Sequence, residues 1–431
     1  MAANGSRTAG RDVPGSIALV VAACAVPLSG WLFWALVLRL GPNDFHDYWL
    51  AGKLLLEGKS PYDAAALSAL AAREHLSFSL GGGYSYPLPF ALVMVPFAEL
   101  PFAVAVTAFN ALSLAAFGVT VAAWLRNAHA AASRRRLVGA AFVAGCFPPI
   151  YGTVAMGQAN LALFPLMAAG MWLAADRHQT RRTSAAAGAL LGLAAVVKLV
   201  PGALLAPLAL ARRWTAGAAL AAAALAAAAV AAMVAPWAMA GSTGLASNLD
   251  ADAFYTNQSI NGFVSRLVTN TSKSLAIAHG AFDPGPAMLA ITAVFGAATL
   301  AVLWAGRERL LERAGLVDGL AFVLVAATIG APKTSFWNEA FVLVAVALVL
   351  AVETPDLRLS RLDPFDRGSL ALWFVTAIVW AVLWAIEPPR SGPLAIALNL
   401  GWSASLLGML ALWLMLARRL ARPRSRSRAA L

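Results

Sequence analysis

Long apolar runs separated by short polar segments make up most of the chain. The hydrocarbon core of a bilayer is about 30 Å thick, so a helix needs roughly 20 apolar residues to cross it. Runs of this length cover residues 16–40, 102–125, 215–240, 286–306, 370–386 and 393–417. The pattern therefore predicts a set of membrane-spanning helices.

Three further apolar stretches are too long for a single crossing. They cover residues 137–175, 184–211 and 318–352, and proline or polar residues interrupt each near its middle. Backbone leaves helical geometry at membrane depth only where it is buried or lines a polar cavity. We expect each stretch to form two helices that turn back on each other. The prediction is an all-α polytopic membrane protein of about twelve spans, with short interfacial helices in its outer loops.

Basic residues are distributed unevenly between the two sides of these spans. With a cytoplasmic N-terminus, the inner segments hold 23 basic residues, all arginine, and the outer segments hold nine. Cytoplasmic loops of membrane proteins carry the excess of Lys and Arg. We therefore expect this protein to lie in a bacterial inner membrane with both of its termini in the cytoplasm. The predicted domains are an N-terminal segment 1–15, one membrane-embedded domain 16–417, and an Arg-rich tail 418–431 that binds anionic lipid.

The composition favours the same class of protein. Hydrophobic residues make up 61% of the chain and charged residues 12%, whereas soluble domains are about 25% charged. The net charge of +12 lies mainly in the inner loops, which indicates membrane lipids as partners rather than nucleic acid. The larger loops, 41–86 and 241–284, face outwards, where ATP and nucleotide sugars are absent. Chemistry on that face therefore favours a lipid-carried substrate.

The first outer loop holds the candidate catalytic carboxylates. Apolar residues at helical spacing predict a short interfacial helix over residues 44–57, ended by Gly58 and Pro61. From the local sequence alone, either Asn43 or Asp44 is expected to be the N-cap of this helix, which is the structural alternative to a catalytic role for Asp44. Asp47 lies one turn later, where a carboxylate interacts favourably with the helix dipole.

The same loop begins a series of motifs that resembles a known family. The motifs occur in order, from about residue 16 to about residue 350. They read Asp44-Phe-x-x-Tyr48-x-x-Ala51, Gly58-x-x-Pro61-Tyr62-Asp63, Tyr84-Ser-Tyr86-Pro87, Gly157-Gln158-x-Asn160, Gly188-x-x-x-Gly192 with Lys198-x-x-Pro201, and Asn257-Gln258-Ser259 with Arg266. In these motifs the chain resembles the polyprenol-phosphate-mannose-dependent mannosyltransferases, glycosyltransferase family 87 of the C-type membrane superfamily.

The resemblance implies transfer of a sugar from a polyprenyl-phosphate donor to a hydroxyl on a glycolipid or polysaccharide, without a metal or other cofactor. In this superfamily an Asp at the start of the first outer loop is the general base, and Asp44 holds that position. An inverting transfer needs a carboxylate to take the acceptor proton, and a positioned base contributes about 10²–10⁴ in rate. Asp47, Asp63 and Glu339 are the other candidates for this role.

The leaving phosphate requires cations on the outer face. Lys198 and Arg266 are the preferred candidates because both lie within matched motifs, and Arg presents a fork of donors suited to phosphate. The alternative for Lys198 is a lysine that extends its amine to the membrane interface. Lys333, in another break, is an open case.

Several uncharged residues are candidates for binding the sugar. Gln158 and Asn160 lie in a break where side-chain amides bind hydroxyls or cap a broken helix. Asn257 and Gln258 accompany Arg266 in the second loop, where Asn257-Gln258-Ser259 is also a glycosylation sequon. Tyr86 is typical of the aromatic belt at a membrane surface and can also stack on a sugar.

One motif departs from the family pattern. The family's late motif reads Ser-Pro-x-Ser-Trp-x-His-His, whereas residues 331–340 read Ala-Pro-Lys-Thr-Ser-Phe-Trp-Asn-Glu-Ala. Glu339 or Asn338 can replace the missing His as a sugar contact, and the departure bears on mannose specificity more than on reaction type.

A transporter or flippase of a lipid-linked sugar is the alternative function, because broken helices and charges at membrane depth also mark transporters.

Overall fold

The computed structural model describes Gly30 and residues 43–76, 84–239, 250–271, 273, 275–386 and 393–422. The regular structure in this part of the chain is helical, and it contains no β-strand, apart from an isolated antiparallel bridge between Asn257 and Ser335. The expected all-α architecture is therefore confirmed. The N-terminal segment 1–15 and nearly all of the expected span 16–40 lie outside the described residues.

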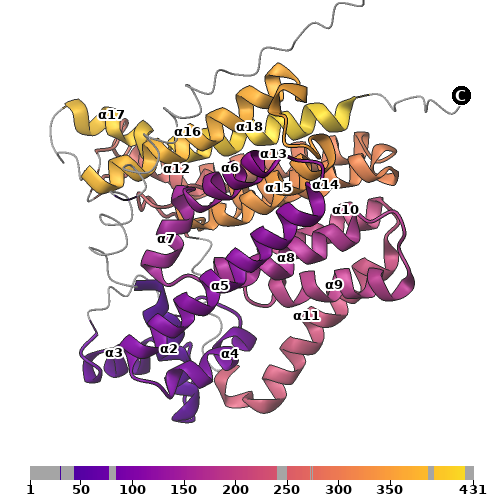
Figure 1. The fold of residues 1–431 in the computed structure, drawn as a ribbon. Coiled ribbons are helices and arrows are strands. Elements are labelled where there is room, and N and C mark those ends of the chain that lie inside the picture. Colours follow the sequence, from indigo (N-terminus) through magenta and orange to yellow (C-terminus); the bar gives the residue numbers. More distant parts are fainter. Residues whose placement is uncertain are drawn as a thin grey trace, which may run out of the picture.

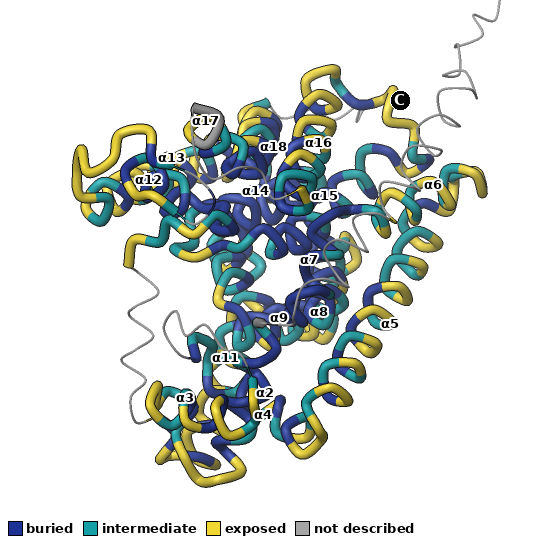
Figure 2. Tube along the Cα trace, turned by 90° about the vertical axis from the view of Figure 1, so that its left-hand side faces the viewer, coloured by how far each residue is buried: buried dark blue, intermediate teal, exposed yellow. Residues whose placement is uncertain are grey.

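A core of buried helices is surrounded by helices with exposed apolar surfaces. The core contains α14 (Arg313–Gly330) and α15 (Ala340–Glu353). The most apolar part of α14 is 78% buried, and the segment Phe336–Glu353, which includes α15, is 67% buried. In three other helices the most apolar part is mostly exposed: it is only 22% buried in α5 (Phe102–Ala128), 17% in α11 (Trp214–Val234) and 17% in α13 (Pro284–Ala305) (Figure 2). Apolar helices that stay exposed within the protein are suited to lipid contact.

The other helices complete this bundle and the loops at its ends (Figure 1). They are α2 (Asn43–Leu56), α3 (Ala64–Arg73), α4 (Leu88–Ala98), α6 (Arg134–Gly145), α7 (Pro148–Met156), α8 (Asn160–Ala174), α9 (Arg181–Ala195), α10 (Leu205–Leu210), α12 (Ile260–Val268), α16 (Pro364–Ile386), α17 (Pro393–Gly401) and α18 (Ala404–Ala421), with the 3-10 helices η2 (Val200–Leu204), η3 (Pro236–Met239), η5 (Arg309–Leu311), η6 (Phe336–Glu339) and η7 (Leu359–Arg361). Helices α12 and α17 lie at the left end of the bundle in Figure 1, and α18 ends on the right.

Two glycines allow α9 and α11 to approach closely. A Cβ on Gly188 would meet the carbonyl oxygen of Ala216 at 2.0 Å, and one on Gly192 would meet that of Leu220 at 2.4 Å. These glycines are four residues apart and lie on one face of α9. The motif thus has a structural role, because small residues let helix backbones touch in a membrane, where no hydrophobic force drives association.

The structure does not confirm the expected number of spans. Within the described residues, seven helices are long and apolar enough to cross a membrane, or eight if α6 and α7, bent by 45°, form one span. The stretch 137–175 forms three helices, and α8 and α9 have 15 residues each. At about 1.5 Å per residue, a helix of that length is shorter than the roughly 30 Å bilayer core.

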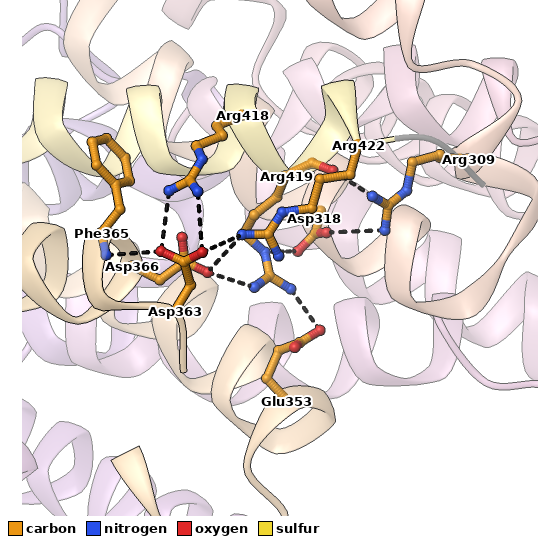
Figure 3. Close-up of polar contacts among 9 residues, drawn as sticks. All are labelled: Arg309, Asp318, Glu353, Asp363, Phe365, Asp366, Arg418, Arg419 and Arg422. Atoms are coloured by element: carbon orange, nitrogen blue, oxygen red, sulfur yellow. Dashed lines mark hydrogen bonds and ion pairs between the residues drawn. The ribbon is translucent and has the colours of Figure 1, made fainter. Parts of the chain in front are cut away.

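The end of α18 contains an ion network (Figure 3). Arg419 is buried and pairs with Asp318 of α14 at 2.7 Å, Glu353 of α15 at 2.6 Å and Asp366 of α16 at 3.0 Å. Arg418 binds Asp363 through two hydrogen bonds of 3.1 and 3.0 Å. Helix α18 thus continues to Ala421, beyond the expected boundary at residue 417, and both arginines contact carboxylates of the protein.

Candidate active site

Helix α2 carries Asp44 in its first turn and Asp47 one turn later. Phe45, Tyr48 and Trp49 are buried and attach the helix to the protein, whereas both aspartates remain partly exposed. Gly58 follows the helix with a φ of +70°, a backbone conformation that only glycine adopts freely. The expected short helix and its glycine stop are therefore present. The two aspartates therefore lie at the edge of the buried part of α2 rather than within it.

The break after α7 brings Gln158 to Asp44. Gly157 ends α7 with a φ of +66°, and a Cβ there would lie 2.5 Å from the Cβ of Phe45. This close approach lets the Gln158 side-chain amide donate a hydrogen bond to Asp44. The Tyr48 hydroxyl donates to Gln158 Oε1 at 2.8 Å, and Gln158 Nε2 also donates to the Tyr86 hydroxyl at 3.2 Å. Gln158 thus orients the carboxylate and is itself held in place.

Lys198 lies in the break between α9 and η2 and reaches the same place. Its Nζ donates a hydrogen bond of 2.7 Å to Asn338 Oδ1 and lies 5.9 Å from the centre of the Tyr86 ring. It is also close enough to Asp44 to stabilise that carboxylate electrostatically. Asn160 Nδ2 donates to the backbone oxygen of Trp337 at 2.8 Å and to Asn338 Oδ1 at 3.3 Å. Residues from four separate segments therefore meet around Asp44.

Burial shifts the acidities of the charged groups in this cluster, named here the Asp44 cluster. Burial raises the pKa of Asp44, while the Gln158 hydrogen bond and the Lys198 charge oppose the rise. Burial and the neighbouring Asp44 charge raise the pKa of Asp47 well above its usual value. Burial lowers the pKa of Lys198, against the effect of Asp44. These shifts bring the pKa values of a potential base, Asp44, and of a potential cation, Lys198, closer to neutral pH.

The Asp44 cluster retains unused hydrogen-bonding capacity. Asp47 Oδ1 and Asn160 Oδ1 are buried and accept no hydrogen bond, and the Trp337 indole N–H makes none, although it lies near enough to stabilise the Asp44 carboxylate. Buried polar atoms in proteins are normally paired, so unpaired ones indicate a place for water or a ligand. The cluster therefore has the properties of a binding site.

Arg266 lies in a second polar cluster. Its side chain is fully buried and donates to the backbone oxygens of Phe254 and Asn257 at 2.9 and 2.7 Å, and to Ser403 Oγ at 2.8 Å. Gln258 Nε2 donates to the backbone oxygen of Trp402 at 2.7 Å. None of the contacts found among the described residues joins Arg266 to Asp44. The geometry favours a structural role for Arg266 over the expected contact with phosphate.

In the motif of residues 331–340, the side chains of Asn338 and Glu339 contact different parts of the protein. The Asn338 side chain joins the Asp44 cluster, whereas the buried Glu339 carboxylate accepts hydrogen bonds from Trp373 Nε1 and Ser405 Oγ in α16 and α18. Of the two residues expected to replace the family's His, Asn338 is therefore the one at the candidate site. Lys333 is exposed. Asp63 accepts hydrogen bonds from the backbone N–H groups of Ala65 and Ala66, which makes it the N-cap of α3.

Tyr48 belongs to the cluster, but from the sequence it was assigned to the apolar helix face and the family motif and not chosen as a site residue. It lies four residues after Asp44, a spacing that places both on one side of α2. That spacing was the available signal. The role of Trp337, which depends on contacts with distant segments, had no comparable local pattern.

Comparison with known proteins adds independent information. The model of glycosyltransferase family 87 matches residues 84–332, which is more than half of the chain. The chain belongs to glycosyltransferase family 87. No curated protein and no solved structure matches it.

Family membership makes the protein a membrane glycosyltransferase, in agreement with its apolar helices. The matched segment of this glycosyltransferase includes Tyr86, Gln158 and Lys198. It does not include Asp44, nor Asn338. Those two residues are connected to the family segment by the contacts that Gln158 and Lys198 make with them.

Proposed function

We propose that this glycosyltransferase transfers a hexose, mannose in the first instance, from a polyprenyl-phosphate sugar to a hydroxyl group of a glycolipid or polysaccharide. The transfer takes place on the outer side of a bacterial inner membrane and inverts the anomeric carbon. Asp44 is the general base. The observation that carries this proposal is the partly exposed Asp44 carboxylate, held by Gln158 beside the Lys198 ammonium.

The proposed chemistry is a single displacement. Asp44 takes the proton from the acceptor hydroxyl as its oxygen attacks the anomeric carbon, and the bond between that carbon and the phosphate oxygen breaks. Polyprenyl phosphate leaves with the electron pair, so it requires a nearby cation more than a strong acid. A raised pKa makes Asp44 a better base near neutral pH, since proton transfer is most efficient when the pKa is close to the working pH.

Lys198 is the cation proposed for the phosphate. It is 9% exposed, and a buried ammonium interacts more strongly with an anion than an exposed one does. Arg266 is left out of this step, because both of its terminal nitrogens donate to protein oxygens. Its contacts instead maintain the second polar cluster, which includes Asn257 and Gln258.

The membrane position of the cluster supports a lipid donor. The α2 end of the molecule carries the Asp44 cluster, and the basic residues concentrate in the segments expected on the cytoplasmic side. A prenyl chain can enter between apolar helices from the bilayer while its phosphate rests at Lys198. Tyr86 is proposed to contact the sugar, because its hydroxyl accepts a hydrogen bond from Gln158 and its ring lies beside Lys198.

A direct assay tests this proposal. Membranes containing the protein receive radiolabelled polyprenyl-phosphate mannose and acceptor glycolipid, with Asp44→Asn and the cap variant Asp63→Asn alongside. Loss of transfer by about 10²–10⁴-fold in Asp44→Asn alone is expected if it removes the base. Wild-type transfer by Asp44→Asn would remove Asp44 from the mechanism. Movement of the donor across the bilayer without transfer would establish a flippase instead, and a cytoplasmic location of residues 43–63 by tag accessibility would overturn the proposed sidedness.

A further inference from the structure

Residues 331–339, named here the late strap, connect the two polar clusters. Asn257 and Ser335 form an antiparallel bridge, in which Gln258 N donates to the backbone oxygen of Thr334 at 2.6 Å. The backbone N–H of Phe336 donates to the backbone oxygen of Thr256 at 2.9 Å. The second polar cluster therefore fixes the first half of the strap by main-chain hydrogen bonds.

The second half of the strap is fixed against α7 and α8. The backbone oxygen of Trp337 accepts hydrogen bonds from Asn160 Nδ2 at 2.8 Å and from Thr153 Oγ1 at 3.2 Å. Asn338 Oδ1 then accepts from Lys198 Nζ at 2.7 Å and from Asn160 Nδ2 at 3.3 Å. The acceptor for the lysine is thus anchored on both sides.

We propose that Asn338 is a positioning residue that holds the Lys198 ammonium beside Asp44, in the place where the donor phosphate binds. This inference rests on the proposed function. Asn338 itself need not touch the reacting atoms. Its effect passes through Lys198.

The chemistry of the two neighbouring strap residues supports this assignment. Lysine has a flexible four-carbon stem that loses side-chain entropy when its ammonium is fixed, so an anchored acceptor lowers the entropy that donor binding must still remove. An amide oxygen does this without neutralising the ammonium, whereas a carboxylate would compete with phosphate for it. Glu339, the adjacent carboxylate, is directed to Trp373 and Ser405 instead. The strap thus presents its neutral side chain to Lys198 and its acidic one to the helix core.

The first test is a double-mutant cycle. Asn338→Leu removes the hydrogen-bond acceptor while keeping a side chain of similar size. It is expected to raise the KM for the donor about tenfold, because one hydrogen bond to a charged group is lost, and to change kcat less. In a Lys198→Met background the same substitution is expected to have no further effect on KM, because its target is absent. Additive effects of the two substitutions would overturn the inference.

The second test uses charge at the same position. The titratable groups that face Lys198 from the packed elements are Asp44 of α2 and Tyr86 before α4. Asp47 of α2 interacts with Asp44. Asn338→Asp adds a carboxylate beside the ammonium, which is expected to move the alkaline limb of the pH–rate profile upward. Asn338→Leu is expected to move it downward. An unchanged alkaline limb in both variants would contradict the proposal, since a purely structural role would leave it in place.

A third measurement does not depend on catalysis. The pH midpoint for labelling of Lys198 by an amine-reactive reagent is read by mass spectrometry in the full-length protein. It is expected to shift downward in Asn338→Leu and to stay at the wild-type value in the control Glu339→Gln. If the labelling midpoint shifts but the wild-type protein has no transferase activity, the proposed function is wrong and the contact between Asn338 and Lys198 stands. Active enzyme with an unshifted midpoint would remove the positioning role alone.

Discussion

The protein brings carboxylates and cations together in two places, and the two are built differently. In the ion network around Arg419, four carboxylates meet four arginines, and every carboxylate has a guanidinium within 4.0 Å (Figure 3). In the Asp44 cluster, Lys198 interacts with Asp44, whereas Asp47 interacts with Asp44 and its Oδ1 accepts no hydrogen bond. One arrangement is balanced in charge, and the other is not.

The difference teaches how the same residue types serve stability in one place and chemistry in another. A balanced network binds α14, α15, α16 and α18 together and leaves little charge to offer a ligand. The Asp44 cluster has an excess of carboxylate, and the raised pKa of Asp47 favours its neutral form, which leaves one negative and one positive charge facing each other. A site of this kind can change its protonation during a reaction.

Arg419→Leu is expected to have the largest effect on stability. It leaves Asp318 and Asp366 buried without their main cation, and removal of one partner from a buried pair costs about 3–5 kcal/mol. Thermal unfolding in detergent measures the loss. Arg418→Leu, which breaks the exposed pair with Asp363, is the control and is expected to lower stability far less, because solvent screens that pair. An altered donor KM in Arg419→Leu with unchanged stability would break the comparison.

Gly157→Ala tests the precision of the Asp44 cluster. The new Cβ would lie 2.5 Å from the Cβ of Phe45, so α2 and Gln158 must move apart. A displacement near 1 Å can cost about 10²-fold in rate, and a loss of that order in kcat is expected from the transfer assay. Gly280→Ala is the matched control: its φ is +68° but open space surrounds it, so the same backbone strain arises without displacement. Equal losses of kcat in the two variants would show that strain alone is responsible.

The pH dependence of transfer gives the smallest expected change. Asp44 must be ionised and Lys198 protonated, so activity rises as pH increases through the pKa of Asp44, above 3.8, and falls as pH increases through that of Lys198, below 10.5. Lys198→Arg is expected to remove the alkaline limb, because arginine stays protonated, and to keep the acid limb. Retention of the alkaline limb in this variant would assign it to another group. The profile of Asp363→Asn, in the ion network, is expected to match the wild type.

Much of the fold followed from local pattern, and the deviations have physical causes. Apolar runs located α5, α11, α13 and α16 to within a few residues, because length and hydropathy are enough to define a long helix in lipid. The stretches around residues 137–175 and 184–211 formed helices too short to be called spans by themselves. Their lengths are set by packing inside the protein, which a count of apolar residues does not include.

The site shows the same division between local and long-range information. Asp44, Gln158, Asn160, Lys198 and Tyr86 were selected as candidates from the sequence, and the structure places them in one cluster. Arg266 was selected with them for its charge and motif but lies in the second polar cluster. The role of Asp44 and the outer location of the cluster remain predictions.

By itself, the sequence determined that this is a helical membrane protein, because apolar segments of bilayer length have one favourable environment and satisfy their backbone only as helices there. Its motifs also indicated the family. The direction of each polar side chain was decided by the tertiary structure alone: Asn338 turns to Lys198 while the adjacent Glu339 turns to Ser405 and Trp373. Neighbours in sequence share a backbone, but their partners come from segments that only folding brings together.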